Sequence, residues 1–123
     1  MTAPMVADET LNESLERIQQ EWGLSDLQMA SLTHVDEQTY AGWKVKNRSI
    51  IADAPAIPSG MSTAVPVVSI YKALVRNFPE ADDRIEWLFK ENNDFGGNKP
   101  IDIATSSVEN LFWMSYYLDF KRG

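Results

Sequence analysis

The sequence predicts an all-α protein, and three features of the chain favour this fold class. Capping boxes, in which Ser or Thr is followed three residues later by Glu or Gln, stand at 10–13, 25–28 and 106–109. Apolar residues recur at spacings of three and four in the segments that follow such starts. Prolines and glycines fall between the periodic segments, where they end helices and form turns. We therefore expect about seven helical segments.

The first third of the chain is expected to hold three short helices. The first follows Thr10 and ends at Gly23, and its apolar residues are Leu11, Leu15, Ile18 and Trp22. The second follows Ser25 and carries Leu27, Met29, Ala30 and Leu32. After a turn over 33–35, Asp36 caps a third helix, along which lie Thr39, Tyr40 and Trp43.

The remainder of the chain is expected to be a linker followed by a small C-terminal helical bundle. The predicted linker, 49–62, contains Pro55, Pro58 and Gly60. A fourth helix starts at Ser62 or Thr63, and its apolar face is Ile70, Ala73, Leu74 and Phe78. Pro79 separates it from a fifth helix that carries Ile85, Leu88 and Phe89. A short helical turn over 101–104 and a last helix from Ser106 almost to Gly123 complete the bundle.

Composition bounds the class of protein. The chain has 123 residues, of which 44% are hydrophobic, so it can form one compact unit with a real core. It contains no cysteine, no apolar run long enough to span a bilayer and no N-terminal secretory signal pattern, which favours a cytoplasmic protein. The net charge of −7 argues against general nucleic-acid binding, although Lys44, Lys46 and Arg48 form a local basic cluster.

The spacing of residues 24–44 is that of a helix-turn-helix. Ala30 allows the two helices to cross closely, Val35 packs from the turn, and Trp43 anchors the end of the second helix. The segment resembles the Xre/Cro-like or homeodomain-like helix-turn-helix of bacterial regulators, with His34 in the place usually held by glycine. The candidate DNA-contacting residues are Gln38, Thr39, Lys44, Lys46 and Arg48. The alternative is a packed trihelical core with no role in DNA binding.

The last helix is apolar around most of its circumference. One stripe is formed by Val108, Leu111, Phe112 and Leu118, and the other apolar residues are Trp113, Met114, Tyr116, Tyr117 and Phe120. A short chain cannot easily enclose a helix on every side, so uncovered aromatic residues predict a partner surface or a homodimer contact. In the alternative, Trp113 and the tyrosines cap the core and keep their polar tips in water.

The segment FGGNKP at 95–100 is predicted to be a structural turn. It lacks the Ser or Thr that follows the lysine in a phosphate-binding P-loop, and a helix rather than a strand precedes it. Gly96 or Gly97 supplies the positive φ, and Pro100 opens the next helical turn. Phe95 and Ile101 are expected to dock this turn on the core.

A family resemblance emerges from residues 84–123, RIEWLFKENNDFGGNKPIDIATSSVENLFWMSYYLDFKRG. This segment resembles the C-terminal toxin-binding domain of the Xre/MbcA/ParS antitoxins. The similarity rests on Trp87-Leu88, two asparagines before Phe95-Gly96-Gly97, Lys99-Pro100-Ile101, and the apolar positions of the last helix. The family also carries an upstream helix-turn-helix, and the two similar segments together cover most of the chain, roughly 24–43 and 67–123.

The resemblance implies a type II antitoxin whose partner is a RES-domain toxin that degrades NAD. The C-terminal end would block the toxin's active site, and the expected plug is Asp119, Phe120, Lys121, Arg122 and Gly123. The partner-binding set then comprises Trp113, Tyr116, Tyr117, Phe120, Lys121, Arg122 and Gly123. On this basis the chain divides into a helix-turn-helix-like domain (1–48), a linker (49–62) and a toxin-binding helical domain (63–123), with autoregulation through operator DNA.

An enzyme is not expected. A single histidine excludes a multi-histidine metal site, and Ser106 and Ser107 are expected to be helix caps without an activating base. No cofactor or metal is predicted. Two other functions stay open, namely a stand-alone helix-turn-helix regulator whose C-terminal domain only dimerises, and an adaptor that no longer binds DNA.

Overall fold

The computed structural model describes residues 11–45 and 63–121, and its regular elements are helical apart from one isolated bridge. In chain order they are α2 (Leu11–Trp22), α3 (Asp26–Thr33), α4 (Glu37–Val45), α6 (Ala64–Asn77), α7 (Ala81–Phe89), the 3₁₀ turn η2 (Asn93–Phe95), α8 (Pro100–Ser106) and α9 (Val108–Lys121). The predicted all-α class is confirmed. None of the helices in these residues is both long enough and apolar enough to cross a membrane. The predicted cap Thr10 and the linker over 49–62 lie outside the described residues.

Several local signals define the helix ends as the sequence indicates. The Ser25–Gln28 capping box is confirmed in both directions, with Ser25 Oγ accepting from the Gln28 N–H and Gln28 Oε1 accepting from the Ser25 N–H. Asp36 caps α4 by accepting a hydrogen bond from the Thr39 N–H at 2.7 Å. α2 is followed by Gly23 in the left-handed conformation, with φ of 68°.

The predicted start of the last helix is wrong by one residue. Ser106 is the final residue of α8, and its hydroxyl donates to the Ile103 carbonyl. The cap is Ser107, whose Oγ accepts a hydrogen bond from the Asn110 N–H at 3.0 Å, and α9 therefore begins at Val108. Two serines stand side by side here, and the capping-box pattern fits Ser106. Ser106 belongs to the preceding helix α8, so the cap is formed by Ser107.

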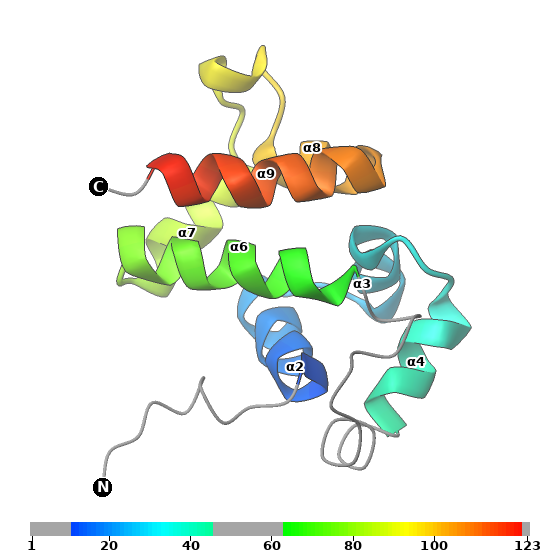
Figure 1. Cartoon of the computed structure of the whole chain (residues 1–123). Coiled ribbons are helices and arrows are strands. Elements are labelled where there is room, and N and C mark those ends of the chain that lie inside the picture. The colour runs from blue at the N-terminus through cyan, green and yellow to red at the C-terminus, as the bar shows by residue number, and fades with distance from the viewer. Residues whose placement is uncertain (1–10, 46–62, 122–123) are drawn as a thin grey trace, which may run out of the picture.

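α6 forms the centre of the molecule. Figure 1 shows α6 and α9 side by side and running in the same direction, with α8 behind α9 and α2 on the opposite side of α6. α3 contacts α4, α6 and α8, and α7 contacts α6 and α8. The chain between α7 and α8 projects beyond α9 and carries η2 at its tip. α9 is thus an outer helix that packs against α6 and α8.

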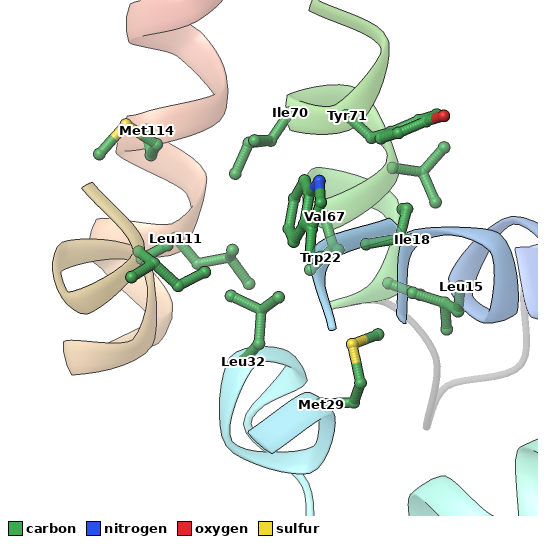
Figure 2. Packing of buried hydrophobic residues seen from close by; sticks show 14 of the residues in the cluster. Leu15, Ile18, Trp22, Met29, Leu32, Val67, Ile70, Tyr71, Leu111 and Met114 are labelled. Atoms are coloured by element: carbon green, nitrogen blue, oxygen red, sulfur yellow. The ribbon is translucent and has the colours of Figure 1, made fainter. Parts of the chain in front are cut away.

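One hydrophobic core joins the N-terminal and C-terminal helices. Figure 2 shows Trp22 of α2, Leu32 of α3, Val67 of α6 and Leu111 of α9 directed toward the same interior. All four are at most 5% exposed. Residues on both sides of the predicted 49–62 linker therefore contribute to one core rather than to two.

Polar contacts inside this core link helices that are distant in the sequence. Gln19 Nε2 donates to the Leu24 carbonyl and to Asp26 Oδ1, while Gln19 Oε1 accepts from the fully buried Tyr40 hydroxyl at 2.8 Å. Burial and nearby carboxylates raise the pKa of Tyr40, which keeps the hydroxyl protonated as a donor. This network fixes α2, α3 and α4 relative to one another.

Arg84 forms the second internal polar link. Its Nη2 and Nε lie 2.7 and 2.8 Å from the two carboxylate oxygens of Glu21, so the contact is bidentate. Its Nη1 donates to the carbonyls of Phe78 and Pro79, where α6 gives way to α7. The Tyr71 hydroxyl also donates to Glu21, and the Tyr71 ring lies 5.9 Å from the guanidinium carbon. α2, α6 and α7 are joined through this cluster.

Candidate functional site: an aromatic face on the last helix

α9 has two opposite apolar faces. Leu111, Met114 and Leu118 recur at spacings of three and four, and each is at most 2% exposed against the core. Trp113, Tyr116 and Phe120 lie on the opposite side of the helix and are 46%, 60% and 88% exposed. We call these three residues, together with the half-buried Tyr117, the α9 aromatic face.

Phe95 holds two residues of the α9 aromatic face in place. Its ring centroid lies 5.9 Å from that of Trp113 and 5.1 Å from that of Tyr117, both in edge-to-face geometry. Trp113 and Tyr117 are themselves stacked, with centroids 5.3 Å apart. Phe95 is buried, so this part of the face has a rigid support in the protein.

The turn that presents Phe95 uses its own backbone groups. Gly96 and Gly97 have φ of 66° and 86°, and Asn92 and Asn98 pair in an antiparallel bridge. The N–H groups of residues 94–98 each donate to an oxygen within the turn. Pro100 is the first residue of α8. Because these amides are already hydrogen-bonded, they do not form a cradle for a phosphate, and the geometry is that of the predicted structural turn.

The aromatic contacts extend from Phe95 to the end of α7. The Trp87 ring meets Phe95 edge-on, with centroids 6.0 Å apart, and the Phe78 ring lies 6.5 Å from Trp87. Trp87 and Phe78 are half-buried. A continuous series of rings therefore runs from the α6–α7 junction to the α9 aromatic face, which single-helix periodicity did not reveal.

Two residues of the predicted α9 surface, Val108 and Asp119, lie in surroundings that the sequence did not predict. Val108, which the sequence puts in one stripe with Leu111, Phe112 and Leu118, is the first residue of α9 and is 39% exposed, whereas Leu111 and Leu118 are buried. Asp119, from the predicted plug, is exposed and forms an ion pair of 3.3 Å with Arg76 of α6. The Lys121 side chain, Arg122 and Gly123 lie outside the described residues.

α3 and α4 contact each other and are joined by a short turn. Ala30 is buried, Val35 packs against the core, and Trp43 is 8% exposed and meets Tyr40 edge-on. His34 adopts the left-handed conformation, with φ of 60° and ψ of 39°. Its Nε2 lies 3.1 Å from the Ala104 carbonyl oxygen, which ties the turn to α8.

The candidate DNA-contacting residues are only partly described. Gln38 and Thr39 are exposed near the start of α4, beside the acidic Glu37. The Lys44 side chain lies outside the described residues, as do Lys46 and Arg48. The described surface at the start of α4 is therefore polar and acidic, and it presents carboxylate, amide and hydroxyl groups.

Comparisons with known proteins leave the family of this chain as a prediction. No protein-family model matches the sequence, and no curated protein sequence matches it. Within residues 11–45 and 63–121, no group of three or more His, Cys, Asp or Glu side chains is arranged to hold a metal ion. The fold and site thus define an all-α protein with an exposed aromatic helix face.

Proposed function

We propose that this protein is a type II antitoxin-like protein that neutralises a RES-domain, NAD-degrading toxin. Its α9 aromatic face and the following tail would bind the toxin and block its active site. The observation that carries the proposal is the exposure of Trp113, Tyr116 and Phe120 on one side of an outer helix. Tryptophan and tyrosine are typical anchors at protein interfaces. The class of toxin comes from the resemblance of residues 84–123 to the antitoxin family.

The spacing of the face suits a helix that lies in a partner's groove. Trp113, Tyr116, Tyr117 and Phe120 occupy positions i, i+3, i+4 and i+7, the usual anchor pattern of this binding mode. The contacts of Phe95 with Trp113 and Tyr117 restrict two anchors before binding, which lowers the entropy lost on association. Lys121 and Arg122 follow the face in the sequence and would favour a site built for a dinucleotide diphosphate.

Binding and neutralisation by surface variants test this proposal. A RES-domain toxin from the same genome is produced with the protein, and cell growth, NAD content and affinity are measured. Phe120→Ala and Tyr116→Ala should each weaken binding by about 30-fold, which corresponds to about 2 kcal/mol for an interface hot spot. Val75→Ala is the control, because Val75 is also exposed, at 39%, but lies on α6. Unchanged affinity of both aromatic variants would exclude α9 as the binding surface.

A second candidate is a stand-alone transcriptional regulator whose C-terminal part only dimerises. It is supported by the contact between α3 and α4, by the burial of Ala30 and by the exposed Gln38 and Thr39. Removal of residues 119–123 separates the two functions, since an antitoxin should lose neutralisation and a regulator should keep its operator affinity. Titration of operator-length duplex with wild type, Lys44→Ala and Lys46→Ala tests DNA binding directly, and equally negligible binding by all three would reject it.

The same variants report on self-association. If the α9 aromatic face is a homodimer contact, light scattering should give twice the monomer mass for wild type and the monomer mass for Phe120→Ala. A wild-type monomer that binds the toxin would assign the face to the toxin alone.

A further inference from the structure

A concave surface lies at the far end of the ring series, next to Trp87. It is a pocket of about 320 Å³ between the residue that follows α6 and one side of α7 with the residues that follow it. Among its lining residues are Phe78, Asp83, Glu86, Trp87, Lys90 and Glu91. Four of these stand at 83, 86, 87 and 90, the i, i+3, i+4 and i+7 positions that share one side of α7 and its C-terminal cap. The pocket therefore combines aromatic walls with a charged rim.

The charge of the rim is predominantly negative. Three carboxylates, from Asp83, Glu86 and Glu91, face one ammonium group, from Lys90. The Lys90 Nζ is 3.8 Å from Glu86, and the two side chains are 72% and 65% exposed, so this ion pair is weak. A cation that enters the pocket would meet an excess of negative charge.

The aromatic walls select among cations. Trp87 and Phe78 are half-buried, with ring centroids 6.5 Å apart, and both line the pocket. A flat guanidinium stacks on an indole face and presents its N–H groups sideways to carboxylates, whereas an ammonium is a more strongly hydrated point charge. The combination of Trp87 with Asp83 and Glu91 therefore favours arginine over lysine.

We propose that this pocket receives an arginine side chain from the protein partner that covers the α9 aromatic face. This inference rests on the proposed function for the existence of that partner. Ring contacts through the buried Phe95 join Trp87, which lines the pocket, to Trp113 of the α9 aromatic face, and we infer that one partner spans both. The partner should carry a basic residue beside an apolar groove, which complements a chain of net charge −7.

A peptide titration tests the pocket without the toxin. The probe is acetyl-Gly-Arg-Gly-amide, added to the full chain, and the indole N–H of Trp87 is followed by nuclear magnetic resonance. The expected result is a saturable shift that weakens with salt, is smaller for the lysine peptide and is absent for the uncharged citrulline peptide. No saturable shift, or an equal shift with citrulline, would overturn the proposal.

Carboxylate variants locate the effect. Asp83→Asn combined with Glu91→Gln should weaken peptide binding at least fivefold, because both changes remove exposed charges from the rim and leave the walls intact. Asp102→Asn combined with Glu109→Gln removes the same number of exposed carboxylates from α8 and α9 and should leave peptide affinity unchanged. Equal losses in the two double variants would indicate non-specific charge attraction and reject the pocket.

The experiments distinguish failure of the arginine-pocket proposal from failure of the antitoxin proposal. If the arginine peptide binds and no toxin does, the antitoxin function is wrong and the cation pocket stands. If the toxin binds and the Asp83→Asn, Glu91→Gln variant binds it with wild-type affinity, the antitoxin function stands and the arginine contact is wrong.

Discussion

Replacement of Arg84 by methionine is expected to destabilise the fold by about 3–5 kcal/mol, because it leaves the Glu21 carboxylate buried without its cationic partner. The two side chains are only 8% and 15% exposed, so water cannot fully replace the lost guanidinium. Methionine fills part of the volume, and the loss therefore reflects charge and hydrogen bonding more than a cavity.

The magnitude follows from the number of contacts that Arg84 makes. Two charge-assisted hydrogen bonds to Glu21 and two bonds from Nη1, at 2.7 Å to the Phe78 carbonyl and 2.9 Å to the Pro79 carbonyl, disappear together. A buried acceptor left without a donor costs about 1–3 kcal/mol, and water that enters the site recovers part of that cost. Removing both charges, as in Glu21→Leu combined with Arg84→Met, should cost less than Arg84→Met alone.

Urea unfolding followed by tryptophan fluorescence measures these differences as free energies of unfolding. The control is Lys90→Met, which breaks the exposed ion pair with Glu86 and should change stability by less than about 1 kcal/mol. The reasoning fails if Arg84→Met is no more destabilising than this control. It also fails if the double variant is less stable than Arg84→Met.

Three further predictions concern acid stability, the turn and the site. The pKa of Glu21 is lowered in the folded protein, chiefly by its hydrogen bonds with the Arg84 guanidinium. The ionised Glu21 therefore contributes fully to stability above the ordinary pKa of 4.5, and this contribution is lost as the pH falls through the lower pKa of the folded state. Urea midpoints measured against pH should consequently fall more steeply in acid for wild type than for Glu21→Gln. Gly97→Ala should lower stability by about 1–2 kcal/mol, because φ is 86° although nothing lies within 4 Å of an added Cβ, whereas Gly42→Ala in α4 should stabilise by about 1 kcal/mol in thermal melting. Phe95→Leu keeps the turn apolar but removes the edge-to-face contacts, and calorimetry should show several-fold weaker partner binding with a retained stoichiometry.

Local signals predicted the helices well because each acts within one turn of chain. Ser25, Asp36 and Pro100 mark helix starts through their own hydrogen bonds or fixed φ, and they do so in the structure. The apolar periods predicted the burial of Leu15, Ile18 and Trp22 in α2 and of Ile70, Ala73 and Leu74 in α6. They did not identify the buried Val67, Val68 and Tyr71, and Phe78, which was expected on the apolar face of α6, is half-buried just after that helix. The prediction of Ser106 as the cap of the last helix was wrong because α8 ends at that residue. The capping pattern of one helix carries no information about where the preceding helix ends.

Contacts between distant segments could not be predicted from these patterns. Glu21 and Arg84 are 63 residues apart, and in sequence each is an ordinary charged residue of an amphipathic helix. The pocket beside Trp87 likewise requires the position of Phe78 at the end of a different helix. Only tertiary packing brings these groups together, so helical periodicity carried no signal for the ion pair or for the acidic, aromatic pocket.

The exposed face of α9 was predictable because it follows from how much helix surface two neighbours can cover. α6 and α8 bury Leu111, Met114 and Leu118, and the side of α9 away from them faces outward (Figure 1). A capping role with polar tips in water accounts for Trp113 and Tyr116, which carry an N–H and a hydroxyl. It does not account for Phe120, which is 88% exposed and has no polar atom. Phe120 is therefore the residue that most favours a covering partner over simple capping.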